Sequence, residues 1–150
     1  MSFAGAADIQ PRIGLGPLRL GMSGDEAAKL LGAPIFRNTR GVTENQFFAN
    51  DIAIAFQDDR ASGISAGRRA KGVTFMGHDV FAEPSRHILR LFLDTAPAWE
   101  KAGMLVFPGL WLIVSGFQDD DPDQKAIVIE SFADWPRGFE QARRFRLNDA

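Results

Sequence analysis

The sequence predicts an α+β fold made of two related halves, each a short helix packed on an antiparallel β-meander, followed by a short C-terminal helix. Apolar residues recur at helical spacing in two segments, they alternate at strand spacing in several others, and one sequence offset relates the two sets. The 150 residues suit a single domain, residues 1–150. Within it we expect an internal repeat of about 12–66 and 72–133 and a C-terminal helix at 134–147.

The first half is expected to begin with a strand and a capped helix. Residues 1–11 are interpreted as a loose lead-in and residues 12–20 as a strand interrupted at Gly16-Pro17. Ser23 followed by Glu26 is typical of a helix start, because the two side chains satisfy free backbone N–H groups. An apolar stripe at helical spacing follows before Gly32 and Pro34 and consists of Ala27, Leu30 and Leu31.

Short strands and a second helix fill most of the remaining chain. The second helix is expected from Pro84 to about Leu93 and a third from Asp134, with Trp135, Phe139, Ala142 and Phe145 on its apolar face. Strands are expected at 35–40, 44–49, 51–57, 60–65, 73–75, 104–107, 110–117 and 126–132. The expected core consists of Leu30, Leu31, Ile52, Ile54, Phe56, Ile88, Leu91, Phe92, Leu112, Val114, Phe117, Ile127 and Ile129.

An offset of 61 residues relates the two halves. Phe56-Gln57-Asp58-Asp59 recurs without change at residues 117–120, and the same shift places the apolar stripe of the first helix on Ile88, Leu91 and Phe92. Neither half would bury much apolar surface alone. We therefore expect the halves to superpose, to share one sheet or two abutting sheets, and to place both helices on one face.

Composition narrows the classes of function. The chain has no cysteine, which excludes disulfides and thiol chemistry, and a net charge of -2, so nucleic acid is not an expected partner. The start has no basic, apolar export signal, and the longest apolar run, Leu110–Val114, is too short to cross a membrane. A cytoplasmic protein without membrane contact is the expectation.

No familiar catalytic or cofactor motif is present. His78 and His87 are the two imidazoles, and structural or surface roles are expected for both, since no nucleophile motif accompanies them. The acidic run 119–123 resembles part of a calcium loop, but Gln124 stands where that loop needs glycine. We expect no catalytic residues, no cofactor and no metal.

The segment around the first helix resembles known families. A segment of this chain is similar to one found in three small bacterial families. It consists of residues 14–23, Gly-Leu-Gly-Pro-Leu-Arg-Leu-Gly-Met-Ser, followed by an expected helix that ends at Leu31-Gly32-Ala33-Pro34. These are the outer-membrane-assembly lipoproteins, the beta-lactamase inhibitor proteins and a set of toxin immunity proteins. The resemblance implies a tandem repeat of helices on a sheet and a role in binding another protein. The chain lacks the lipid-anchor cysteine of the first family and the disulfides of the second.

The function expected from these observations is non-enzymatic protein binding, by an inhibitor or immunity protein that neutralises a toxin or enzyme. Two alternatives stay open: a small-ligand-binding domain or enzyme of unfamiliar type, and an assembly or scaffold subunit. The two acidic hairpin tips are expected to lie near one another, so that their charges sum into one negative field that steers the partner, and aromatic rings would anchor it. The expected partner-binding residues are Asp58, Asp59, Asp119, Asp120, Asp121 and Asp123 at the tips, with Trp99, Phe47 and Phe48 as anchors.

Overall fold

The computed structural model describes residues 7–132, 135–136 and 138–147. Within them lie two α-helices, α1 (Gly24–Leu31) and α2 (Ser85–Thr95). The predicted cap of the first is confirmed: the Ser23 hydroxyl oxygen accepts the N–H of Glu26 at 3.2 Å. Gly32 then ends α1 with a φ of 82°, a backbone conformation that glycine adopts without steric cost.

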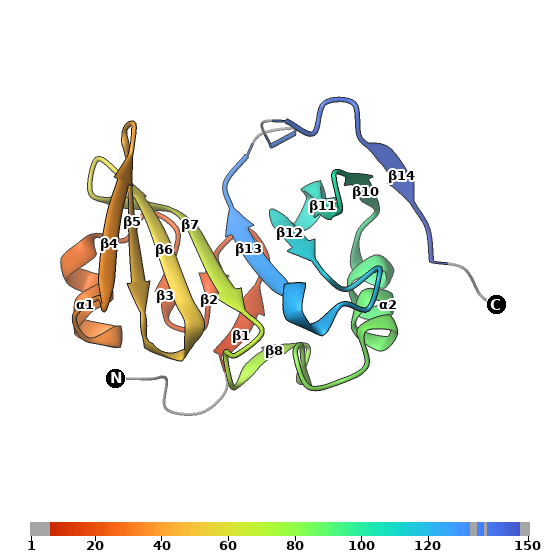
Figure 1. The fold of residues 1–150 in the computed structure, drawn as a ribbon, viewed down its shortest axis with the longest axis horizontal. Coiled ribbons are helices and arrows are strands. Elements are labelled where there is room, and N and C mark those ends of the chain that lie inside the picture. Colours follow the sequence, from red (N-terminus) through yellow and green to blue (C-terminus); the bar gives the residue numbers. More distant parts are fainter. Residues whose placement is uncertain (1–6, 133–134, 137, 148–150) are drawn as a thin grey trace.

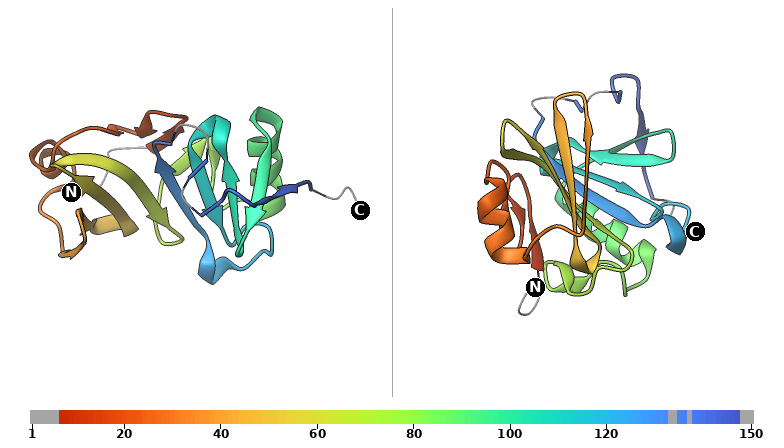
Figure 2. Two further views of the ribbon diagram at one scale, coloured as in Figure 1. Left: turned by 90° about the horizontal axis from the view of Figure 1, so that it is seen from above. Right: turned by 60° about the vertical axis from the view of Figure 1, so that its left-hand side comes forward.

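The larger of the two sheets among the described residues consists of antiparallel strands. Its strands are β4 (Phe36–Arg40), β5 (Thr43–Phe48), β6 (Ile52–Gln57), β7 (Arg60–Gly67), β10 (Ala98–Lys101), β11 (Met104–Phe107), β12 (Leu112–Ser115), β13 (Ala126–Glu130) and β14 (Arg143–Phe145). Across these nine strands of the described chain the order is β14-β10-β11-β12-β13-β7-β6-β5-β4. Figure 1 shows the two meanders, β4–β7 and β10–β13, meeting where β7 pairs with β13, and Figure 2 shows how strongly the sheet twists.

A smaller sheet lies beside the helices. Its five strands in the described residues are β1 (Ala7–Gln10), β2 (Gly14–Leu15), β3 (Leu18–Arg19), β8 (Val73–Phe75) and β9 (His78–Asp79), in the order β3-β2-β1-β8-β9. The predicted loose lead-in is wrong for residues 7–10, because β1 pairs with β2 and runs parallel to β8. Residues 1–6 of that lead-in lie outside the described residues. Short 3₁₀ turns occupy Ala49–Asp51, Pro108–Leu110 and Pro122–Gln124.

One apolar cluster joins both helices, the small sheet and one face of the large sheet. It contains buried residues from α1, from α2 and from both meanders, so the helices pack on the same face. Most of the predicted core is confirmed. Leu30 is the clear exception, since 36% of it is exposed, and Leu91 is only half-buried. Leu30 and Leu91 lie at the margin of a wide apolar stripe on their helices. The buried apolar residues that face the sheet are Ala27 and Leu31 in α1 and Ile88, Leu89 and Phe92 in α2.

The predicted C-terminal helix at 134–147 is wrong where the structure describes it. Residues 135–136 and 138–147 contain turns and strand β14, and residues 134 and 137 lie outside the described residues. Phe145 pairs with Ala98 of β10, and Trp135, Phe139 and Ala142 pack with Val106 and Ile113 on the sheet face away from the helices. Contacts with the sheet outweigh helical spacing here, as tertiary packing commonly does.

The two halves have the same order of elements. A short hairpin, a helix and a four-stranded meander occur first as β2, β3, α1 and β4–β7, then as β8, β9, α2 and β10–β13. The two meanders join through antiparallel pairing of β7 with β13. Whether the halves superpose stays a prediction. Neither helix of the described residues has the length and apolar character that a membrane crossing requires.

Candidate functional site

The first acidic tip is a two-residue turn between β6 and β7. Asp58 and Asp59 have φ angles of 51° and 56°, a left-handed pair that suits the twist of a hairpin. The Asp59 carboxylate accepts the N–H of Gly24 at 3.0 Å, at the start of α1. That N–H has no partner within the helix, and a negative charge is favoured there. Asp59 therefore attaches α1 to the end of its own meander.

The second acidic tip is the loop between β12 and β13. Its Asp120 carboxylate accepts the side-chain hydroxyl of Ser85 at 2.8 Å, at the start of α2, where Asp59 instead accepts a backbone N–H at the start of α1. Asp121 accepts the N–H of Asp123 at 3.2 Å within the loop. Part of the predicted contact surface thus holds the fold together, and exposed Asp58, Asp119 and Asp123 are the tip carboxylates outside these helix contacts.

The two tips do not lie together, and the expectation that their charges sum into one field is wrong. β7 and β13 are antiparallel, with Gly67 opposite Ala126 and Gly63 opposite Glu130. The loop that precedes Ala126 therefore lies at the Gly67 end of β7, whereas the Asp58-Asp59 turn precedes the other end. An ion pair of 3.9 Å between Arg68 and Asp123 lies at the Gly67 end. Antiparallel pairing of the meanders places equivalent turns at opposite ends of the sheet.

Replacing Asp59 with alanine should destabilise the protein by about 1 kcal/mol more than replacing Asp58, because Asp59, unlike Asp58, bonds to the first N–H of α1. Both substitutions put alanine at a left-handed position, so that shared cost cancels in the difference. Urea denaturation of the two variants measures it. Equal stabilities would mean that the Asp59–Gly24 hydrogen bond contributes nothing in solution.

The predicted aromatic anchors divide into exposed and packed residues. Phe47 and Phe48 are neighbours in β5 and face opposite sides of the sheet, as consecutive strand residues do. Phe47 is 38% exposed, but Phe48 is 4% exposed and belongs to the core, so it is not available as an anchor in this conformation. Trp99 is half-buried, with its ring 5.0 Å from that of Trp135 and the Arg144 guanidinium 5.1 Å above it. Trp99 therefore already packs against other residues of the chain.

An exposed apolar group at the β4–β5 hairpin includes residues that the sequence did not single out. Phe36 lies opposite Phe47 on the sheet face away from α1, with ring centroids 5.6 Å apart. Exposure is 58% for Phe36 and 75% for the adjacent Ile35. The sequence held a partial signal, since two adjacent phenylalanines in one strand cannot both enter one core. The hairpin register that completes the pair was not predictable from spacing alone.

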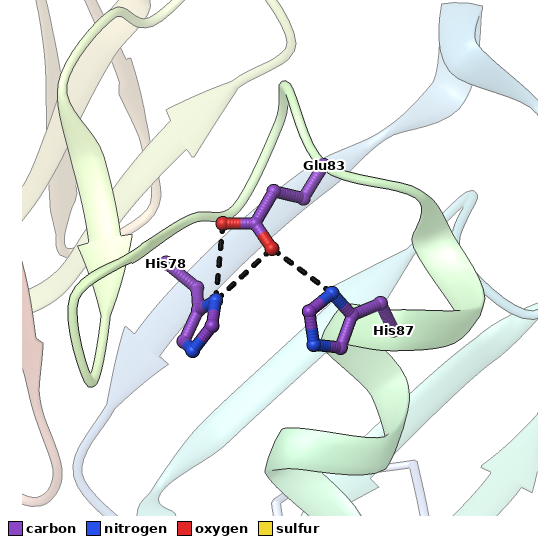
Figure 3. Close-up of side chains that lie close together, drawn as sticks. All are labelled: His78, Glu83 and His87. Atoms are coloured by element: carbon purple, nitrogen blue, oxygen red, sulfur yellow. Dashed lines mark hydrogen bonds and ion pairs between the residues drawn. The ribbon is translucent and has the colours of Figure 1, made fainter.

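A second group brings together both histidines and Glu83 (Figure 3). His78 lies in β9, Glu83 in the loop before α2, and His87 in the first turn of α2. His78 Nδ1 is 3.0 Å and 3.1 Å from the two Glu83 carboxylate oxygens, and His87 Nδ1 is 2.9 Å from Oε1. The two rings are 5.0 Å apart and nearly perpendicular. The sequence pointed to each histidine separately and not to Glu83, although its spacing of four residues from His87 was a usable signal.

The backbone before α2 fixes the position of Glu83. The Asp79 carboxylate accepts the N–H groups of Phe81 and Ala82, and the Asp79 N–H donates to Glu83 Oε2 at 3.0 Å. Partial desolvation opposes ionisation of Glu83, but the His78 hydrogen bond, the Asp79 N–H and the charges of both imidazoles outweigh it and lower the pKa of Glu83. The carboxylate is thus held ionised between two imidazoles.

Comparison with known proteins found no family model that matches this chain, no matching curated protein and no matching solved structure. The likeness to inhibitor and immunity families stays a prediction, carried by residues 14–34 alone. The function of the chain therefore has to follow from the geometry of the exposed aromatic pair and of the histidine group.

Proposed function

We propose that this chain is a non-enzymatic protein-binding domain that inhibits or neutralises another protein, with its contact surface on the first meander. The observation that carries the proposal is the exposed pair Phe36 and Phe47 on the sheet face away from α1. Large apolar side chains gathered on a surface are typical of interaction sites, and aromatic rings contribute a large share of binding energy there. The cytoplasmic location stays a prediction.

The rest of that face suits a docked partner. Beside Phe47 the neighbouring strands present Ala53, Ala55 and Ser65, small side chains that leave the sheet surface low and accessible. Strand β4 also ends the sheet, so one of its backbone edges is not paired within the described residues. A partner that covers the aromatic pair gains apolar contact at its centre and polar contact around it.

Charge favours a basic or mixed-charge partner. Residues 119–123 lie at the same end of the sheet as Phe36 and Phe47, since Phe47 is opposite Ala53 and Ile52 is opposite Ala66, beside Gly67. Exposed Asp119 and Asp123 would then speed association rather than tighten the complex. The Asp58-Asp59 turn lies at the other end and contributes less.

We further infer that a duplication produced the two halves. The contacts Asp59 to Gly24 and Asp120 to Ser85 support it, because both members of the second pair lie 61 residues after those of the first. The Phe-Gln-Asp-Asp identity would then reflect a shared helix attachment. This assigns the repeated motif to folding and leaves binding to the side chains in which the halves differ.

The test is affinity capture from the native cell, followed by binding kinetics with the captured partner. A Phe36→Ser/Phe47→Ser double variant should dissociate at least about tenfold faster, since the central apolar contact is lost. Met76→Ser is the matched control, because Met76 is 66% exposed but lies in the β8–β9 turn. Equal dissociation of the double variant and the parent would place the contact surface elsewhere.

Salt dependence separates steering from anchoring. An Asp119→Asn/Asp123→Asn variant should associate more slowly at low salt and show a flatter salt dependence, whereas Asp58→Asn should change neither. A partner that proves to be a second copy of this chain would instead favour the scaffold alternative.

A further inference from the structure

We propose that His78, Glu83 and His87 form a binding site for a divalent transition-metal ion, of which Zn²⁺ is the reference example. One ligand atom from each of the three side chains lies within 4.8 Å of the other two. In the part of the chain that the structure describes, these are the residues that group in this way, and the acidic run 119–123 does not. This proposal gives both histidines a binding role, where the sequence predicted structural or surface roles.

The observed distances are close to those of a coordination sphere. In a tetrahedral zinc site with bonds of about 2.0–2.1 Å, neighbouring ligand atoms are about 3.3 Å apart. The Nδ1 to carboxylate distances of 2.9 Å to 3.1 Å are already near that value. Only the two imidazoles must approach each other, by at most about 1.5 Å, which rotation of exposed side chains supplies.

The donor set selects the class of metal. Two imidazole nitrogens and one carboxylate suit zinc and its neighbours, whereas Mg²⁺ and Ca²⁺ prefer oxygen ligands throughout. A neutral imidazole binds through Nδ1 when its proton resides on Nε2, so metal binding requires that tautomer of both histidines. Three protein ligands leave a further position open, and exposures of 39%, 29% and 49% for His78, Glu83 and His87 place it toward solvent.

The surrounding contacts support a formed site. The Asp79 N–H holds Glu83 Oε2, which leaves Oε1 directed at both imidazoles (Figure 3). Outer contacts of this kind orient metal ligands and raise affinity. His87 is carried by α2, whose first turn is fixed by Ser85 and Asp120. Each ligand thus comes from a segment that the fold already positions.

The competing interpretation is a clamp in which Glu83 only joins β9 to α2 by hydrogen bonds. Thermal melting and calorimetric titration with Zn²⁺ alone distinguish the two, starting from protein treated with EDTA. Zinc at 100 times its dissociation constant should raise Tm by roughly 5–10 °C, and Mg²⁺ at the same concentration should not. Co²⁺ should give the visible absorption of a low-coordinate nitrogen and oxygen site.

Variants assign the zinc effect to the two histidines. His87→Ala and His78→Ala should each lower zinc affinity by more than about 100-fold and abolish the Tm rise. Arg86→Ala, an exposed change in the same turn of α2, is the matched control and should bind like the parent. Titration below the Tm of each metal-free variant keeps binding separate from stability. A parent that shows no Tm rise with zinc, or histidine variants that bind zinc like the parent, would overturn the proposal and leave the clamp.

Discussion

Replacing Phe92 with alanine should lower the free energy of unfolding by about 3–5 kcal/mol. Phe92 is fully buried at the centre of the main core, and its ring centroid lies 4.9 Å from that of Phe75 and 5.5 Å from that of Phe107. The cavity would open where α2, the small sheet and the second meander meet, and the remaining rings, held by β8 and β11, cannot close over it. Urea denaturation followed by circular dichroism measures the loss.

The matched comparison is Leu30→Ala in α1. The sequence placed Leu30 in the core with Phe92, but it is 36% exposed, so its truncation should cost less than about half as much. Similar losses at the two positions would contradict the burial pattern of the helices.

Replacing Gly116 with alanine should destabilise the protein by at least about 3 kcal/mol. Gly116 has a φ of 78°, and a Cβ placed on it would lie only 2.5 Å from the Lys125 nitrogen and 2.8 Å from the Asp121 carbonyl oxygen. Both neighbours are backbone atoms and cannot rotate away. The loop that carries Asp120 to Ser85 would have to open, so the attachment of α2 would weaken as well.

Gly103→Ala separates the cost of the left-handed backbone conformation from the cost of the steric contact. Gly103 has nearly the same φ, 80°, but nothing lies within 4 Å of its added Cβ, so only the conformational cost of about 1–2 kcal/mol applies. Thermal or urea unfolding of the pair compares them. A Gly116→Ala variant as stable as Gly103→Ala would mean that the close approach at residues 121–125 is absent in solution.

Much of the first meander was predictable, because its strands are regular and alternate cleanly. The buried face of β6 was predictable from Ile52, Ile54 and Phe56, and its C-terminal end from the turn residues Asp58-Asp59. Shorter or edge strands carried less signal. β10 has four residues that follow Pro97, and β14 has three whose apolar neighbours are spaced as in a helix. Pairing with residues far along the chain decides both, and local sequence does not report it.

The candidate sites divide in the same way. Sequence alone identified the Phe-Gln-Asp-Asp repeat but not its purpose, because the bonds to Gly24 and Ser85 span 35 residues. It also singled out both histidines but did not predict that they lie together. Their proximity depends on the turn after Asp79, which places Glu83 between them. Exposure of Phe36 depended on which sheet face the helices cover.

The position of β1 bears on how the chain folds. Ala7 and Asp8 pair with Val73 and Thr74, and β7 pairs with a strand that begins about sixty residues after it. During synthesis β1 is among the first described segments to emerge, yet its parallel partner arrives only with the second hairpin. Long loops must therefore close before either hydrogen-bonded pair forms, which slows folding relative to a chain of local contacts. Until then the inner edge of the first meander is unpaired and open to pairing with other chains.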